Sequence, residues 1–286
     1  MNMKNVTRFL LLAVSIFAAI NLKSQPGVFQ PGDYRDGIYD KENSINRRFI
    51  PYTHLREGDV TWEKRVWREL DMREKQNQQL YYPVESVLSR ISYLQVLLKH
   101  ILSGEIIAFS DDEFLIPLEL SNIRMKIMRQ ADSTDQIGYL ADGTEVTTKI
   151  LPPADSTWMM KEFRKLKVKE DWYFDKQKSV LEVRILAMGV VTWDAVKELP
   201  IDQFYVYFPA CRPFFSKYEV YNAKNDAERR TFEDIFWKRQ FSSTATRETN
   251  VYDRNIGEYS KGIDALLESD RIKNDIFRWE HDLWHF

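Results

Sequence analysis

Hydrophobic and polar residues alternate in two neighbouring stretches near the middle of the chain. The apolar members of the first stretch and then of the second are Leu166, Val168, Trp172 and Phe174, followed by Leu181, Val183, Ile185 and Ala187. A period of two is that of a strand with one buried face, and the polar residues 175–178 between the stretches suit a turn. The pattern predicts an antiparallel hairpin with Trp172 opposite Leu181 and Val168 opposite Ile185. A third strand is expected at Phe204–Phe208.

A four-residue spacing of large apolar side chains precedes this region. Trp62, Val66 and Leu70 lie four residues apart, and Trp67 lies beside them. Because this spacing places side chains on one face of a helix, we expect a helix over Val60–Asn77. Trp62 would then lie in the core. Trp67 would lie at the edge of the apolar stripe, where flanking cations favour a protein interface; the alternative is that it only widens the core stripe.

A second helix is expected from Pro83 to Gly104, because apolar residues recur there at intervals of three and four. The two helices would form an antiparallel pair. The other expected elements are a strand at Ile106–Phe109, a helix at Leu118–Arg129, a loop at Ala131–Pro153, a helix capped by Asn225 and Glu228 with Phe232, Ile235 and Phe236 facing inward, a connection at Ser242–Thr249, and helices at Ile256–Leu267 and Ile272–Leu283. Together they predict an α+β fold, in which a small antiparallel sheet with a long central hairpin is packed by several helices.

The first 24 residues have the order of a secretory signal peptide. Lys4 and Arg8 precede the apolar run Phe9–Ile20, and Ser24 offers a cleavage site with no cysteine nearby to carry a lipid. A retained membrane anchor is the alternative. Residues 25–48 contain Pro–Gly and Asp–Gly pairs and few apolar residues, so they predict an extended N-terminal arm. Residues 49–286 are expected to form a single domain.

Charge and cysteine content narrow the class of function. The formal net charge is −2, and removal of the signal peptide takes away basic residues and no acidic one. An acidic chain does not suit nucleic-acid binding, which needs a basic face. Cys211 is the only cysteine, so an intramolecular disulfide is excluded. We expect a buried thiol, and an intermolecular disulfide is the alternative.

Few residues suggest catalysis or metal binding. His281 and His285 are four residues apart, but no third Cys or His ligand lies near them in the sequence, and we expect no metal site. The acidic run Asp111–Glu113 suits a solvated turn better than a calcium site. The sequence lacks the nucleophile-elbow, zinc-protease, phosphate-loop and dinucleotide-binding patterns. We therefore expect neither an enzyme nor a bound cofactor.

Glu170 interrupts the apolar face of the first hairpin strand, and Asp171 follows it directly. Neighbouring carboxylates are able to serve acid–base catalysis. A charge on an apolar face is more often held by a partner of opposite charge, because burying it alone is costly. We expect Glu170 to pair with Arg184 or with a partner subunit.

Short segments spread from Arg47 to the C-terminus resemble those of a known family. They are Arg47–Tyr52, Arg56–Val60, Lys64–Arg68, Lys169–Lys176, Val183–Ile185, Tyr207–Pro209, Glu219–Asn222, Asn225–Ala227, Asp234–Phe236, Arg239–Ser243, Asn250–Arg254 and Glu280–Trp284. By these segments the chain is similar to the GldN/PorN family, and residues 131–153 match it least.

The resemblance implies a periplasmic component of the type IX protein secretion system, needed for protein export and gliding motility. In that family the protein assembles with an outer-membrane lipoprotein of the GldK/PorK type into a ring. It also contacts the periplasmic part of a GldM/PorM-type motor protein. The resemblance thus implies self-association within a ring, attachment to the inner face of the outer membrane through a partner, and no catalytic residues.

Aromatic and arginine side chains are enriched at the centres of protein interfaces. The candidate residues for a partner interface are Phe29, Tyr34, Trp67, Arg68, Glu170 and Arg184. An exported glycan-binding module or hydrolase, whose tryptophans would stack on sugars, is the alternative function.

Overall fold

The predicted hairpin lies at the centre of the fold. In the computed structural model, β5 (Phe163–Asp175) and β6 (Val180–Asp194) are antiparallel neighbours. Trp172 pairs with Val183 and not with Leu181. This register differs from the expected one by two residues, so the same side chains still share a face.

A β-bulge changes the register further along the hairpin. It lies between Lys169 and Glu170, and beyond it Val168 pairs with Met188 in place of the expected Ile185. An extra residue in one strand bends that strand and increases its twist. Alternation alone does not reveal such a residue, so the sequence pattern predicts the hairpin without its bulge.

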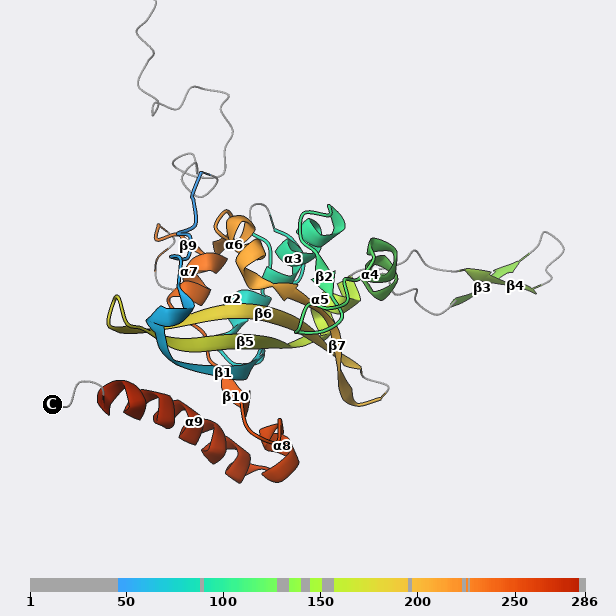
Figure 1. Ribbon diagram of the computed structural model, residues 1–286. Helices are drawn as coiled ribbons and strands as arrows, with labels where there is room; N and C mark the ends of the chain where they lie inside the picture. The colour runs from blue at the N-terminus through green and yellow to red at the C-terminus, as the bar shows by residue number, and fades with distance from the viewer. Residues whose placement is uncertain are drawn as a thin grey trace, which may run out of the picture. The chain divides into compact units, whose positions relative to one another are not determined.

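The hairpin is part of a six-stranded antiparallel sheet with the order β10–β1–β5–β6–β7–β2 (Figure 1). The flanking strands are β10 (Thr244–Glu248), β1 (Val60–Asp71), β7 (Leu199–Tyr207) and β2 (Ala108–Phe109). The expected strand at 204–208 is thus the second half of β7. The expected strand at 106–109 is the edge strand β2.

The expected first helix is wrong, because Val60–Asp71 forms strand β1. A spacing of four residues is compatible with both structures: it is one turn of a helix and twice the period of a strand. Along the strand Lys64 and Arg68 share a face with Val66, so they interrupt the apolar alternation and leave only the four-residue spacing visible in the sequence. Val, Thr and Trp side chains also favour a strand here.

The expected connection at 242–249 is also a strand, because β10 pairs with β1 along Val66–Glu69. Serine and threonine at these positions suggest a loop, yet Thr fits well in a strand. The expected long helix at 83–104 is correct only in its second half, where α3 (Tyr93–Leu102) begins with a capping box of Ser92 and Gln95. The helical pair predicted for this region is therefore absent from residues 60–87 and 90–104.

The remaining elements are η1 (Glu57–Asp59), α2 (Gln78–Tyr81), α4 (Leu120–Ile127), β3 (Thr134–Tyr139), β4 (Glu145–Ile150), α5 (Thr157–Glu162), α6 (Phe208–Phe215), β8 (Glu219–Val220), β9 (Arg230–Thr231), α7 (Phe232–Trp237), α8 (Ile256–Tyr259) and α9 (Ile263–Asp282). Of these, α4 and α7 lie where helices were expected, with changed bounds. The two helices expected at 256–267 and 272–283 are instead the short α8 and the single long helix α9. The expected loop at 131–153 contains the antiparallel pair β3–β4. The capping box of α7 is formed by Thr231 and Asp234, and not by Asn225 and Glu228.

The structure describes residues 46–87, 90–127, 134–139, 145–150, 157–194, 197–222, 225 and 227–282. The expected signal peptide and nearly all of the expected arm lie outside these ranges, so their boundaries stay predictions. Within these ranges, every helix is too short or too polar to cross a membrane. The mixture of helices with an open antiparallel sheet confirms the α+β class.

Two hydrophobic clusters cover one face of the sheet. The larger joins α3, α6 and α7 to β5, β6 and β7 and includes Leu166, Val190, Phe204, Phe215 and Phe236. The smaller joins α8 and α9 to β1 and β10 and contains Val66, Ala245, Ile256, Ile272 and Ile276. Figure 1 shows α9 beside β1 and β10, whereas α6 and α7 lie beyond β6.

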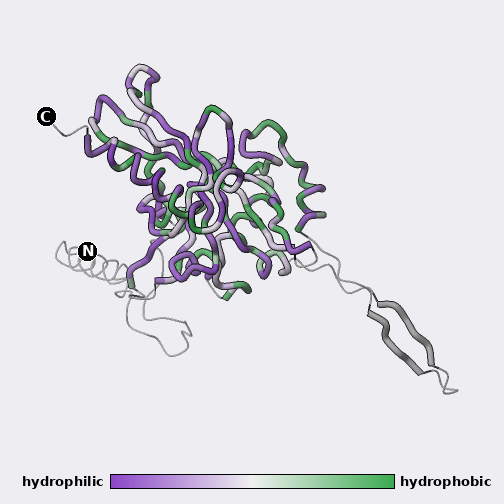
Figure 2. Tube along the Cα trace, turned by 90° about the horizontal axis from the view of Figure 1, so that it is seen from below, coloured by the Kyte–Doolittle hydropathy of each residue, from purple (hydrophilic) through white to green (hydrophobic). Residues whose placement is uncertain are grey.

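The smaller cluster fixes α9 to the sheet. Ile272 and Ile276 are buried, and Trp279 stacks on Trp62 with their ring centroids 4.3 Å apart. Trp62 is half-buried, so it belongs to the margin of this cluster and not to the centre of the core. The α9 tube in Figure 2 changes between hydrophilic and hydrophobic colours, as expected of a helix with one apolar stripe.

We expect Ile272→Ala to lower the free energy of unfolding by about 2–5 kcal/mol, because the fully buried side chain leaves a cavity. Leu267→Ala on the same helix is the control. Its side chain is 61% exposed, so the change should be within about 0.5 kcal/mol. Urea unfolding measures both. Equal losses would show that α9 does not dock through its Ile272 face.

Candidate functional site

The face of the sheet opposite the two clusters carries a row of cationic and aromatic side chains. Trp67 of β1 pairs with Arg247 of β10 on one side and with Lys169 of β5 on the other. Side chains paired directly across antiparallel strands point to the same face. The register therefore places Trp67 between two positive charges.

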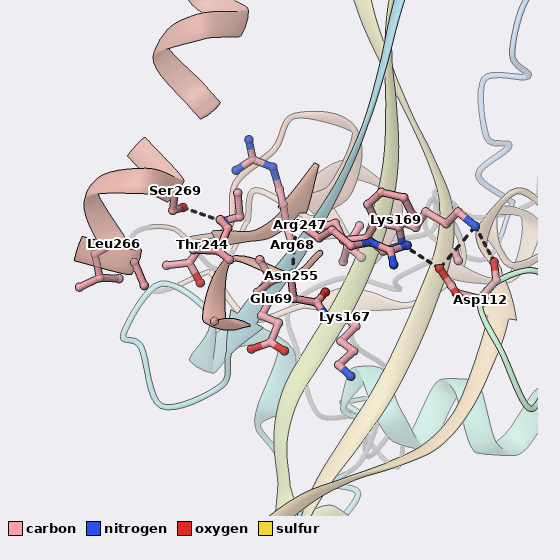
Figure 3. Close-up of a pocket in the computed structure, with 18 of the residues that line it drawn as sticks. Arg68, Glu69, Asp112, Lys167, Lys169, Thr244, Arg247, Asn255, Leu266 and Ser269 are labelled. Carbon is pink, nitrogen blue, oxygen red and sulfur yellow. Dashed lines mark hydrogen bonds and ion pairs between the residues drawn. The ribbon is translucent and has the colours of Figure 1, made fainter. Parts of the chain in front are cut away.

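Trp67 is held from three sides. Its Nε1 donates a hydrogen bond of 2.7 Å to Asp112 Oδ2, and the Arg247 guanidinium lies 3.6 Å from its ring centroid. Lys169 Nζ lies 5.7 Å from the ring centroid and donates to the backbone oxygen of Asp112 at 2.9 Å. Figure 3 shows Lys169 and Asp112 facing each other across this contact. A tryptophan with its N–H satisfied and a cation over its ring is fixed in orientation.

Asp112 is the charged centre of this arrangement. Burial raises the pKa of its carboxyl, but the hydrogen bond from Trp67 and the charge of Lys169 lower it by more. The pKa consequently lies below its ordinary value, and Asp112 is ionised at neutral pH. An anion held in this way neutralises Lys169 and fixes the loop that follows β2.

A pocket of about 490 Å³ adjoins Trp67. Its walls come from β1, β5 and β10, from the loop after β2, and from α8 and α9. Ser269 of α9 closes one side, because its Oγ accepts a hydrogen bond of 2.7 Å from the Ala245 backbone N–H (Figure 3). The charged side chains of the lining all have partners of opposite charge. Lys169 pairs with Asp112 inside the pocket, and the others pair with residues outside it, namely Arg68 with Glu170, Glu69 with Lys165, Lys167 with Asp202 and Arg247 with Asp253.

The loop between β10 and α8 presents the most exposed apolar side chains of this region. Val251 is 97% exposed and Tyr252 is 73% exposed. The side chain of Asn250 supports the turn, since it accepts from the N–H groups of Tyr252 and Arg254 at 3.1 and 3.0 Å. The Arg254 guanidinium lies 4.5 Å from the Tyr252 ring centroid. We call Asn250–Arg254 the Asn250 loop.

Arg68 and Glu170, two predicted interface residues, are buried inside the chain. Arg239 binds Glu170 with two hydrogen bonds of 2.9 and 3.0 Å, and Arg68 Nε lies 3.2 Å from the same carboxylate. Trp172 Nε1 donates to it at 3.2 Å. The expected pairing of Glu170 with Arg184 is therefore wrong. Arg239 lies just after α7, and its sequence position gives no signal of this contact.

Arg184 instead holds the segment that precedes η1. Its Nη2 donates to the backbone oxygen of Thr53 at 2.7 Å, and its guanidinium lies 5.0 Å from the Tyr52 ring centroid. Phe29 and Tyr34, the other two predicted interface residues, lie outside the described residues. Of the four predicted residues that the structure describes, Trp67 and Arg68 line the pocket; Arg68 is buried, whereas Trp67 is half-buried and held by Asp112 from a loop.

A buried ion pair that sequence reasoning missed holds the same segment. Arg212 Nη2 lies 2.6 Å from Glu233 Oε1 and also donates to the backbone oxygen of Ile50 at 2.6 Å. Its guanidinium lies 4.0 Å from the Tyr52 ring centroid. Burial raises the pKa of Glu233, although the hydrogen bond and charge of Arg212 oppose this. A lone arginine between Cys211 and Pro213 in an apolar stretch was the available signal.

The remaining candidates for chemistry do not form a site among the described residues. Within the described ranges, His, Cys, Asp and Glu side chains form no group of three or more that could hold a metal ion. His285 lies outside those ranges. Cys211 is buried, as expected, and burial raises the pKa of its thiol to about 12. A thiol in this state is a poor nucleophile.

Comparison with protein families gives a match over most of the chain. The model described as gliding motility associated protein GldN matches residues 55–285. The matched segment begins before β1 and includes the sheet, both hydrophobic clusters and the Trp67 site. A search of curated proteins gives no match.

We expect Glu170→Gln to lower the free energy of unfolding by about 3–5 kcal/mol, because it leaves two arginines without their buried anion. Asp171→Asn on the next residue is the control. Asp171 pairs with Arg65, whose side chain is 38% exposed, so its loss should cost less than about 1 kcal/mol. Urea unfolding of both variants measures the difference. A Glu170→Gln loss as small as that of the control would contradict the role of the ion cluster.

The lowered pKa of Asp112 predicts a pH-dependent contribution to stability. Its ionised form stabilises the fold above the ordinary carboxyl pKa of about 3.9, and this contribution is lost as the pH falls through the lower folded-state pKa. Asp112→Asn should therefore be less stable than the original chain at neutral pH, and the gap should close in acid. Urea midpoints across this range measure it. A gap that is constant with pH would assign the loss to packing.

Proposed function

The chain belongs to the GldN family of gliding motility associated proteins, and from this membership we propose that it is a non-enzymatic structural subunit of the type IX protein secretion system. In this proposal it forms part of a periplasmic ring needed for protein export and gliding motility. Its partners are an outer-membrane lipoprotein of the GldK/PorK type, the periplasmic part of a GldM/PorM-type motor protein, and further copies of itself.

The family match over residues 55–285 is the observation that carries the proposal. The Trp67 site supports it, because its charged groups are used to fix two surface loops. The Asn250 loop adds two large exposed apolar side chains on a turn stabilised by hydrogen bonds. Apolar side chains fixed in this way lose little entropy on association, which favours binding to a protein partner.

The alternative of a glycan-binding module gains no support from four of the tryptophans that the structure describes. Trp62 stacks on Trp279, and Trp237 stacks on Tyr52 with 5.9 Å between ring centroids. Arg247 covers Trp67. A sugar-binding platform needs an aromatic face open to the ligand, and these four rings already have partners within the chain.

We expect the protein to reach the outer membrane only through its lipoprotein partner. In cells that lack the lipoprotein, the chain should move from the outer-membrane fraction to the soluble periplasmic fraction. Cell fractionation followed by immunoblotting measures this, and cells with the lipoprotein restored are the control. Persistent attachment to the outer membrane without the lipoprotein would contradict the proposal.

Replacing the two exposed residues of the Asn250 loop should weaken assembly without affecting folding. The variant Val251→Ser with Tyr252→Ser should keep its melting temperature, since both side chains are largely exposed. Its co-purification with the lipoprotein and motor partners, and export in cells, should fall. The control is Met125→Ser, which removes a 70% exposed side chain from α4. Normal assembly and export by the double variant would exclude this loop from the interface.

A further inference from the structure

The loop between β2 and α4 holds two aliphatic side chains in solvent. Leu115 is 71% exposed and Ile116 is 60% exposed. The loop is closed at its base by a hydrogen bond of 3.0 Å from the Ser110 N–H to the Ile116 backbone oxygen. Trp67 and Lys169 hold its Asp112, as described above. Such a loop keeps its apolar side chains exposed and does not fold them onto its own surface.

The backbone of this loop is strained in a way that supports the same conformation. Phe114 has a φ of 63°, in the left-handed region that is uncommon for a bulky residue. Its ring packs edge-on against Phe109 and Tyr207, with centroid distances of 5.2 and 5.3 Å. Turning Phe114 inward leaves the next two side chains pointing to solvent. An ordered, exposed apolar pair marks an interaction surface.

The loop is also acidic. Asp111 and Glu113 flank Asp112, whose charge Lys169 neutralises, and neither of them has a cationic partner within the described ranges. Asp111 Oδ1 accepts from the Leu115 N–H at 3.2 Å, which places the acid close to the exposed pair. The loop therefore combines apolar side chains with unpaired negative charge.

A groove elsewhere on the chain has the complementary character. Its volume is about 900 Å³, and its lining includes Tyr82, Val87 and Tyr221, which are 57%, 55% and 52% exposed. Lys75 and Arg90 also line it, and none of its described lining residues is Asp or Glu. Among the described residues, no carboxylate pairs with Lys75 or Arg90. The Arg90 guanidinium lies 5.3 Å from the Tyr221 ring centroid.

We propose that Leu115 and Ile116 of one copy of this chain insert into the groove lined by Tyr82, Val87 and Tyr221 of a second copy, with Glu113 facing Arg90. The occupant is a second copy because charge and hydropathy match on both sides: an acidic loop with exposed aliphatic residues meets a basic groove with exposed aromatic residues. The inference rests on the proposed function, in which copies associate. It adds the two surfaces that meet.

The geometry of this contact has a consequence for assembly. Loop and groove come from different elements, so a copy that donates its loop still has a free groove. Such a heterologous contact repeats from copy to copy and gives a closed ring or an open filament, depending on the rotation between copies. An isologous contact would stop at a dimer.

Disulfide cross-linking in cells that contain the lipoprotein tests the contact directly. A chain with both Leu115→Cys and Tyr221→Cys should give a ladder of dimers, trimers and larger species on non-reducing gels. Co-expressed single variants should give dimers only. The native Cys211 is buried and stays in place. The control pair is Val251→Cys with Tyr221→Cys. It should give no ladder, because Val251 is highly exposed but lies outside the loop between β2 and α4.

Charge reversal supplies an independent measure in the same cysteine background. Glu113→Lys or Arg90→Glu alone should reduce the ladder about tenfold or more, because each places like charges across the contact. The two reversals together should restore it. Failure of the double reversal to restore the ladder would overturn the assigned pairing.

The outcome is separable from that of the proposed function. If the chain still co-purifies with the lipoprotein but Leu115→Cys and Tyr221→Cys give no ladder, the inference is wrong and the proposed function stands. Cross-linking of Leu115→Cys to the lipoprotein in place of a second copy would likewise overturn the inference. If co-purification itself is absent while the ladder forms, the inference stands and the proposed lipoprotein partnership is wrong.

Discussion

The burial of one carboxylate, Glu170, sets the arrangement of the whole sheet face. Its direct neighbours across the strands are Val66 and Ile185, which belong to the smaller and the larger hydrophobic cluster respectively. A charge at this boundary would be very costly alone, and the guanidinium groups of Arg68 and Arg239 make it tolerable. Arg239 takes a φ of 52° directly after α7, where glycine is usual. We infer that an arginine stands there because its side chain must reach Glu170, and so α7 is tied to the strands that carry α9.

The second constraint is the pair Arg212 and Glu233, which fixes the segment that follows the predicted arm. Arg212 joins α6 to α7 and at the same time binds the backbone of Ile50 and covers the ring of Tyr52. A guanidinium is able to do all three, because its donors lie in a plane whose faces remain free for aromatic rings. The segment Ile50–Tyr52 is therefore fixed to α6 and to α7, and α7 is the helix that Glu170 ties to the sheet.

Sequence reasoning reached the parts of this fold that follow from local periodicity. The central hairpin, β2, α4 and the inward face of α7 were predictable, since their spacings fit one structure only. β1 was not, because residues four apart satisfy a helix and a strand equally, and β10 was hidden by serine and threonine.

At the site, Trp67 was predictable as an unusual residue. Its contacts with Asp112 and Arg247 were not, because they depend on strand order and on a bulge in β10. Glu170 was recognised as needing a cation, but the choice among distant arginines requires the tertiary structure.

These contacts change the role of Trp67. Its indole N–H fixes Asp112 and with it the loop that exposes Leu115 and Ile116. Its ring supports Arg247, whose Nη1 lies 3.4 Å from the carboxylate of Asp253 in the Asn250 loop. Asp253 is largely exposed, so this ion pair is weak alone, and the stacked ring is what keeps Arg247 in place. One half-buried side chain thus supports two separate exposed surfaces. A tryptophan anchored in the sheet between these two loops therefore keeps both exposed surfaces at a fixed spacing.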